Sequence, residues 1–154
     1  MKLLVLTIFF SLATEIAYAC PNLNGNYYQE QDGAQIWKTI SQKNCQQFIV
    51  TGKVIYNGTT QVLGPDTFLV DGIFRKHPAS NSAFTEMDAY TFTKKTLRRS
   101  IMTAGLLSPN QYYIIGGAQI TEVDSNGNLA DTYIVYNEDG SIQKTFREFF
   151  KRLP

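Results

Sequence analysis

The chain has 154 residues, of which 44% are hydrophobic and 13% aromatic, and its formal net charge is +1. This length suits one domain, and a charge so close to zero gives no electrostatic basis for binding nucleic acid or an anionic membrane. Two cysteines and one histidine are too few for a typical zinc site or a cysteine–histidine nucleophile. We therefore expect no metal, no cofactor and no thiol-based catalysis.

The start of the chain is typical of a secretory signal peptide. Lys2 precedes an apolar run over residues 3–13, and the small-residue site Ala17-Tyr18-Ala19 stands directly before Cys20. Glu15 interrupts the apolar stretch well short of the roughly 20 residues that span a bilayer, and no later segment is longer. The pattern predicts an exported protein with no transmembrane segment.

Cys20 would be the first residue after cleavage, and two fates are open to it. Bacterial lipoproteins are acylated at a cysteine in this position, but their signals carry Leu and a small residue where this chain has Ala17 and Tyr18. We predict a signal peptide over 1–19 and one secreted or periplasmic domain over 20–154. In that domain Cys20 forms a disulfide with Cys45, and lipid anchoring is the alternative.

The rest of the chain alternates segments rich in Tyr, Phe, Ile, Val and Thr with Gly, Asn, Asp and Pro, at a spacing of about ten residues. This pattern predicts an all-β domain of eight or nine antiparallel strands. Hairpin turns are expected at Asn57-Gly58, at 124–128 and at 137–140, which implies up-and-down order. The expected strands are 24–31, 35–41, 46–56, 67–76, 84–93, 95–103, 111–123, 130–137 and 141–151.

Glycines in the inward-facing rows indicate how the sheet is shaped. Gly52 interrupts a row of apolar residues, and Gly72 and Gly116-Gly117 are placed similarly, which suits a sheet that bends sharply and closes on itself. We predict a single antiparallel up-and-down β-barrel, with a β-sandwich as the alternative. Residues 141–151 also fit an amphipathic helix, so a short C-terminal helical turn stays open.

The segment Leu23-Asn24-Gly25-Asn26-Tyr27-Tyr28 resembles the opening strand of lipocalin-like and avidin-like barrels, in which a Gly-x-Trp element closes one end of the barrel. The resemblance implies that Tyr27 takes the aromatic role. It also implies that Arg147, on the final strand, packs on Tyr27 as a cation–π partner that seals the barrel. The resemblance bears on the fold rather than on the function.

The expected barrel suggests a binding protein. A closed barrel of about eight strands holds one small ligand or fills with side chains. We expect a small apolar or amphipathic ligand in the interior; the alternative is a filled barrel that acts as an inhibitor, envelope or other protein-binding module through the loops 78–83 and 103–111. The candidate lining residues are Tyr27, Trp37, Phe68, Phe74, Tyr90 and Tyr112.

Two carboxylates raise an enzymatic alternative. Glu86 and Asp88 share a strand face with Tyr90, so an inward orientation would place two acids in an aromatic cavity suited to a small hydrolase or isomerase. The opposite face of this strand is equally able to point inward. We therefore expect both acids to be solvated and the protein not to be an enzyme.

The run Asp124–Asn128 resembles the start of a calcium-binding loop. It lacks the glycine at the sixth position and the Glu at the twelfth, so the sequence favours a turn.

Overall fold

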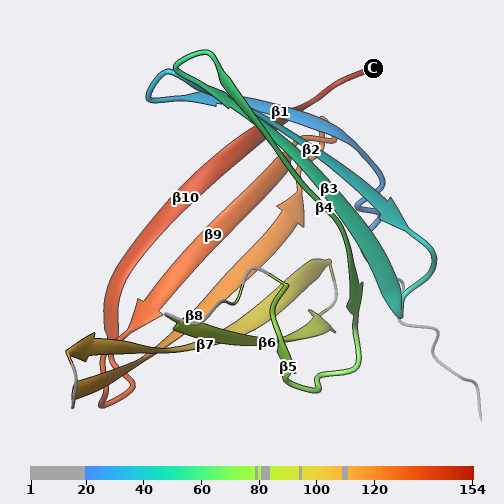
Figure 1. Cartoon of the computed structure of the whole chain (residues 1–154). Helices are drawn as coiled ribbons and strands as arrows, with labels where there is room; N and C mark the ends of the chain where they lie inside the picture. The colour runs from blue at the N-terminus through green and yellow to red at the C-terminus, as the bar shows by residue number, and fades with distance from the viewer. Residues whose placement is uncertain (1–19, 79, 81–83, 94, 109–110) are drawn as a thin grey trace, which may run out of the picture.

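The computed structural model describes residues 20–78, 80, 84–93, 95–108 and 111–154, and the predicted signal peptide lies outside this range. The described chain is all-β, and ten antiparallel strands form one sheet (Figure 1). No helix in the described part is long and apolar enough to cross a membrane. The strands are β1 (Gly25–Gln31), β2 (Ala34–Gln42), β3 (Gln47–Tyr56), β4 (Thr59–Leu69), β5 (Arg75–Lys76), β6 (Phe84–Thr93), β7 (Thr96–Ser108), β8 (Gln111–Val123), β9 (Leu129–Tyr136) and β10 (Ile142–Arg152).

The strand order confirms the predicted antiparallel, up-and-down arrangement. Neighbours run β4-β3-β2-β1-β10-β9-β8-β7-β6-β5, so sequential strands pair, and β1 joins β10 between the two ends of the chain. The hydrogen-bonded ladder is open between β4 and β5, and the sheet is therefore not closed. Figure 1 shows it curled, so that the edge strand β4 approaches β5 and β6.

The predicted strand over 67–76 is wrong, and with it the count of eight or nine strands. The structure has a long strand β4 before this segment and a two-residue β5 at its end. Gly64 and Pro65 read as a break in the sequence, yet both lie inside β4. Proline is tolerated there because β4 is an edge strand, and the pairing register shifts between Val50 and Gly52 to absorb the irregularity.

The predicted turns at Asn57-Gly58 and at 124–128 are confirmed. Asn57 and Gly58 have φ values of +49° and +73°, as a tight two-residue hairpin between β3 and β4 requires. Asp124 accepts hydrogen bonds from the side chain and backbone of Asn128, and these lower the pKa of its carboxyl. Its oxygens therefore serve the turn between β8 and β9.

The C-terminal segment is a strand to Arg152, and no helical turn follows within the described chain. β10 pairs with β9 over most of its length and with β1 only at its end, where Tyr27 faces Arg152. Leu153 adds a backbone hydrogen bond of 2.8 Å to Asn26. These contacts hold the two ends of the chain together.

The core lies where β1 to β3 face β6 to β10. Tyr27 is fully buried, its hydroxyl donates to the carbonyl of Leu23 at 3.0 Å, and burial raises its pKa. The Cys20–Cys45 disulfide ties the segment before β1 to the segment before β3, with Cα atoms 5.5 Å apart. The buried cluster consists of Leu23, Tyr27, Ile40, Phe48, Tyr90, Leu97, Leu129 and Phe150.

The connection between β4 and β5 carries an ion pair with a measurable signature. Arg75 donates to both carboxylate oxygens of Asp71, at 2.7 and 2.6 Å, and lowers the pKa of that carboxyl from 3.8 to about 2. A depressed pKa means that the pair stabilises the fold above about pH 4, and that this contribution is lost as the pH falls through about 2.

We expect NMR titration of the Asp71 carboxyl carbon to show a midpoint near 2, and the Arg75→Gln variant to raise it towards 3.8. Asp139 is the internal control. Its pKa is also lowered, but by hydrogen bonds from Ser141, so Arg75→Gln should leave its midpoint unchanged. A wild-type midpoint near 3.8 would show that the Arg75 pair does not form in solution.

Candidate functional site

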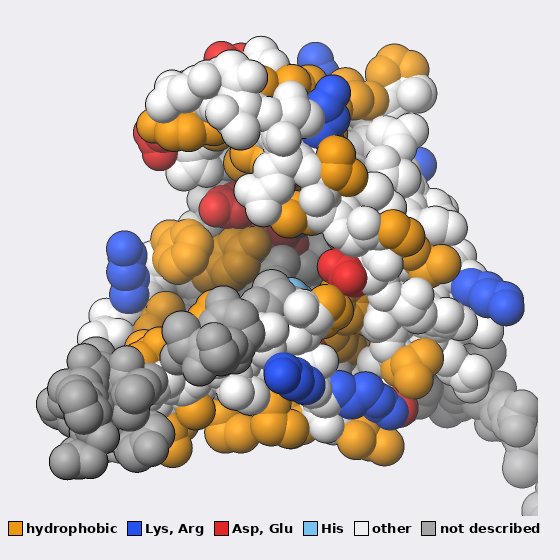
Figure 2. All heavy atoms as spheres, in the orientation of Figure 1, with side chains coloured by type: hydrophobic (Ala, Val, Ile, Leu, Met, Phe, Trp, Pro, Cys, Tyr) orange, Lys and Arg blue, Asp and Glu red, His pale blue; other side chains and the backbone are white. Residues whose placement is uncertain are grey.

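A cavity of about 320 Å³ lies inside the curl of the sheet. Figure 2 shows the hollow on one face of the molecule, with apolar and acidic side chains around it. The lining residues are Ile36, Trp37, Lys38, Ile40, Phe48, Val50, Gly52, Val54, Leu63, Asp66, Phe68, His77, Tyr90, Leu97, Arg99, Gln119, Thr121, Leu129, Asp131 and Tyr133.

One wall of the cavity is mostly apolar, and Lys38 and Asp66 are its charged residues. It is built by alternate residues of β2, β3 and β4, because successive side chains on a strand point to opposite faces. Phe48 and Phe68 pair across β3 and β4 with ring centroids 5.2 Å apart, and Tyr90 of β6 contacts both, at 5.2 and 5.0 Å. These rings bridge the open edges of the sheet through side chains.

A buried ion pair joins this wall to the opposite one. Asp131 on β9 is fully buried, and it accepts hydrogen bonds from Lys38 Nζ on β2 at 2.7 Å and from Thr121 Oγ1 at 2.6 Å. Lys38 also lies 4.1 Å from the centre of the Phe150 ring. The pair links strands from the two halves of the sheet. Because water is excluded from the carboxylate, removing either partner would leave the other charge poorly compensated.

A second charged cluster surrounds Arg99 on β7. Its Nε and Nη2 atoms lie 2.9 and 2.8 Å from Asp88 Oδ2, and Nη2 also contacts Glu86 Oε1. Tyr90 donates to the same oxygen of Asp88 at 3.0 Å, and burial raises the pKa of Tyr90. The expectation that both acids are solvated is therefore wrong: Asp88 is 4% exposed and Glu86 is half-buried.

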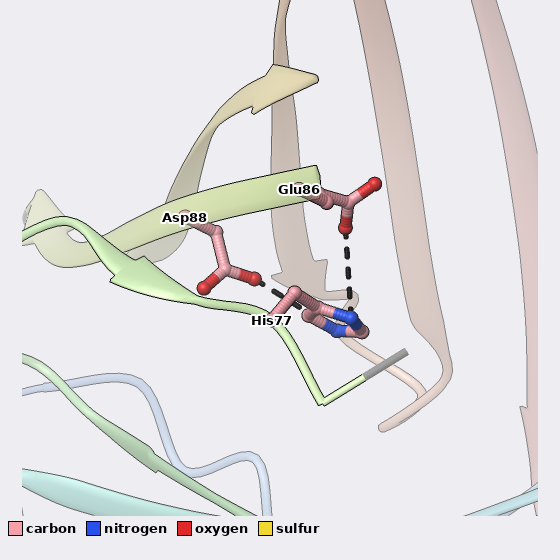
Figure 3. Close-up of side chains that lie close together, drawn as sticks. All are labelled: His77, Glu86 and Asp88. Atoms are coloured by element: carbon pink, nitrogen blue, oxygen red, sulfur yellow. Dashed lines mark ion pairs between the residues drawn. The ribbon is translucent and has the colours of Figure 1, made fainter. Parts of the chain in front are cut away.

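His77 lies between these two acids (Figure 3). Its Nδ1 is 3.7 Å from Glu86 Oε1 and its Nε2 is 3.8 Å from Asp88 Oδ2, while its ring stacks on Phe68 at 5.9 Å. Residue 77 follows β5 directly, and its backbone N–H bonds to the carbonyl of Glu86 at 2.8 Å, which fixes the imidazole beside the acids.

His77, Glu86 and Asp88 offer atoms within 4.8 Å of one another that could ligate a metal. The oxygens that face the imidazole are, however, the same two that the Arg99 guanidinium contacts. An ion at this place would have to displace Arg99 or share its position against like charge. The cluster is therefore better described as an ion-pair network in which arginine supplies the cation.

The aromatic residues predicted to line the interior are found in different places. Phe68 and Tyr90 line the cavity. Trp37 borders it, but its ring contacts Tyr28 at 5.1 Å and the Lys53 ammonium at 5.1 Å. Phe74 is 45% exposed in the connection between β4 and β5.

Two further candidates complete the predicted set. Tyr27 belongs to the buried core and is absent from the residues found around the cavity. The backbone of Tyr112 belongs to β8, and its side chain lies outside the described residues.

The predicted pair of Tyr27 and Arg147 is not formed. Arg147 faces Thr132 in the register of β10 and β9, packs 4.9 Å above the Phe149 ring, and pairs with Glu122 at 3.3 Å on the surface. The resemblance placed the cation too early in the strand, because only the last residues of β10 reach β1.

The loops expected to bind a protein partner, 78–83 and 103–111, lie partly outside the residues that the structure describes. Residues 79, 81–83 and 109–110 lie outside the described residues, and the side chains of 106–108 and 111 do so as well.

The charged residues of the interior are those that the sequence interpretation missed. Lys38 alternates with Ile36 and Ile40, and Arg99 alternates with Leu97 and Ile101. A single charge inside an apolar row is a signal, because the row must face the core and the charge then needs a partner there. The partners themselves come from strands distant in the sequence, and the local pattern does not identify them.

No protein-family model matches the sequence, and no curated protein matches it. A solved structure provisionally named a thioesterase II, from Thermobifida fusca YX, aligns over 84% of this chain and 77% of its own length, with 9% identity and a TM-score of 0.36. At that score the likeness carries no argument about the fold or the function of this chain.

Proposed function

We propose that the protein is an exported binding protein that holds a small amphipathic ligand inside its curled sheet. In this role the sheet works as an up-and-down β-barrel whose open side, between β4 and β5, is bridged by side chains. The observation that carries the proposal is the cavity of about 320 Å³, whose lining is mostly apolar on β2 to β4 and includes several polar groups on the opposite strands. Ligand sites typically combine a mostly apolar lining with a few placed polar groups, in volumes of roughly 300–1,000 Å³.

The polar wall includes a group suited to a ligand. Gln119 lines the cavity, and within the described part of the chain its side-chain amide has no hydrogen-bond partner. An amide offers both donors and an acceptor, so it suits a neutral polar group. Its neighbours Asp131 and Thr121 are already satisfied by each other and by Lys38.

The disulfide supports the export part of the proposal. Disulfides persist in secreted and periplasmic proteins and are rare where thiols are kept reduced. Cys20 and Cys45 are joined in the structure, and both cysteines of the chain are thereby used. This bond suits a mature chain that begins at the cysteine and stays free of a lipid anchor.

Binding is favoured over hydrolysis or isomerisation by the position of the acids. Among the described residues, His77 and Arg99 reach the cavity, whereas Glu86 and Asp88 do not line it. Both acids are held by the guanidinium. A general acid or base must reach the reacting atom, and these two groups are screened from it by their own partners.

Filling the cavity tests the proposal. Gly52 lines the cavity, and a Cβ at this position would meet Leu63 at an ordinary distance of 3.4 Å. We expect Gly52→Leu to weaken binding of the fluorescent probe N-phenyl-1-naphthylamine by about tenfold or more, because the added side chain takes the space of the probe. Fluorescence titration gives the dissociation constant, and thermal unfolding checks that the variant folds.

The matched control is Thr51→Leu, which adds a similar side chain to the same strand on the opposite face. This control should bind the probe like the wild type. Native mass spectrometry of protein purified from its own host adds a direct readout, since a bound ligand appears as mass lost on denaturation. Wild-type protein that neither binds the probe nor carries such a mass would overturn the proposal.

A further inference from the structure

We infer that the ligand is a small apolar or aromatic molecule with a cationic group, such as a protonated amine, and that Asp66 receives this group. The inference rests on the proposed function and names the chemical class of its ligand. It starts from a carboxylate at the open edge of the sheet that the fold does not use.

Asp66 lies on the edge strand β4, in register with Val50 and two residues before Phe68. It lines the cavity and is half-buried. Within the described part of the chain its side chain takes part in no hydrogen bond and no ion pair. A carboxylate that is partly withdrawn from water is stabilised by a cation or by donors, and here the protein supplies neither.

The other charged groups around the cavity are satisfied within the protein. Lys38 pairs with Asp131, and Arg99 pairs with both Glu86 and Asp88. No cation of these pairs is left over for Asp66. It also lies on an edge strand, beside the opening of the ladder between β4 and β5.

The charge balance of the interior favours a cation. Two bases, Lys38 and Arg99, and two acids, Asp66 and Asp131, line the cavity. Glu86 and Asp88 do not line it but pair with Arg99, so the lining charges together with their partners give 2 − 4 = −2 when His77 is counted as neutral. Protonation of His77 would still leave the balance at −1. A cavity with walls of low dielectric strengthens this field, so a cation is attracted to it and an anion is repelled.

The aromatic residues beside Asp66 suit the same ligand. Residues i and i+2 of a strand share a face, so Phe68 lies next to the carboxylate and continues into the cluster with Phe48 and Tyr90. The face of an aromatic ring is negative and attracts ammonium groups, while the same rings receive an apolar or aromatic body. The carboxylate would bind the ammonium group of such an amine, and the rings would bind its apolar or aromatic body.

Other charged ligands fit this arrangement less well. An anion would need a free base, and Lys38 and Arg99 are engaged. A divalent metal ion prefers several oxygen or nitrogen ligands, and Asp66 offers one carboxylate while the acids beside His77 hold Arg99. A single ammonium group needs only one carboxylate and an aromatic face.

Three probes with one fluorophore test the inference: N-(2-aminoethyl)dansylamide is cationic, dansylamide is neutral and dansylglycine is anionic. We expect the wild type to bind the cationic probe at least about tenfold more tightly than the anionic one. Asp66→Asn should raise the dissociation constant of the cationic probe by about tenfold and change that of dansylamide by less than about twofold. Fluorescence titration at low ionic strength gives the three dissociation constants.

Glu138→Gln is the control, because it removes one negative charge from the turn before β10, away from the cavity. It should leave all three dissociation constants unchanged. Salt provides a second measurement that needs no variant. Added NaCl should weaken binding of the cationic probe and leave binding of dansylamide unchanged. Equal binding of the three probes, insensitive to salt and to Asp66→Asn, would overturn the inference and keep the binding function. Failure of all three to bind would overturn the binding function itself.

Discussion

Replacing Lys38 with Met is expected to lower the free energy of unfolding by about 3–5 kcal/mol. Methionine is similar in length to lysine and can still pack over Phe150, but the substitution removes the ammonium group 2.7 Å from Asp131. Asp131 is 0% exposed, so its charge would remain buried, and Thr121 would be the one donor left to it among the described residues. Urea unfolding of the wild type and the variant gives the difference.

Two further variants make this prediction specific. Lys38→Met combined with Asp131→Asn removes both charges and keeps an acceptor for Thr121, and it should recover most of the lost stability. Arg147→Met breaks a pair of the same type on the surface, with side chains 49% and 47% exposed, and should cost less than about 1 kcal/mol. Equal effects of Lys38→Met and Arg147→Met would contradict the burial argument.

Removing the disulfide is expected to have the second largest effect. Cys20 and Cys45 are 25 residues apart, and closing a loop of this length stabilises a fold by about 3 kcal/mol through the unfolded chain. The double variant Cys20→Ser, Cys45→Ser should therefore have a free energy of unfolding lower by about 3 kcal/mol, and it should unfold at a lower urea concentration. The bond also holds the segment before β1, in which Leu23 is fully buried.

Reduction of the wild type with dithiothreitol should reproduce the effect of the double variant. The double variant itself should be insensitive to the reductant, which separates loss of the bond from any effect of the serines. Wild-type protein whose unfolding midpoint is unchanged by full reduction would show that the bond contributes nothing to stability.

The sequence predicted the fold best where short-range chemistry decides it. Left-handed residues at Asn57-Gly58 and the polar turn at 124–128 mark hairpins that the structure confirms. Alternation identified β3 and β6 with nearly their observed bounds. It failed at β4, because Gly64 and Pro65 end most strands, and only the edge position of this one makes them acceptable.

The candidate site was much less predictable. Glu86 and Asp88 share a strand face that could have pointed either way, since the opposite face is also mildly apolar. What draws them inward is Arg99, which β7 places beside them, and His77, which the chain brings back from β5. Such partners are set by strand pairing over long separations, and a local pattern of residues carries no information about them.

The bridge between β4 and the opposite edge is made by Phe68 against Tyr90 and His77 rather than by a backbone ladder. Parting two hydrogen-bonded strands requires cooperative local unfolding, whereas a contact between side chains can part by a change of rotamer that leaves the backbone ladders intact. Movement of the Phe68 ring away from Tyr90 would therefore widen this side of the interior while every strand stays paired. The rates of uptake and release would then follow the packing of Phe68 and would be independent of the global stability of the protein.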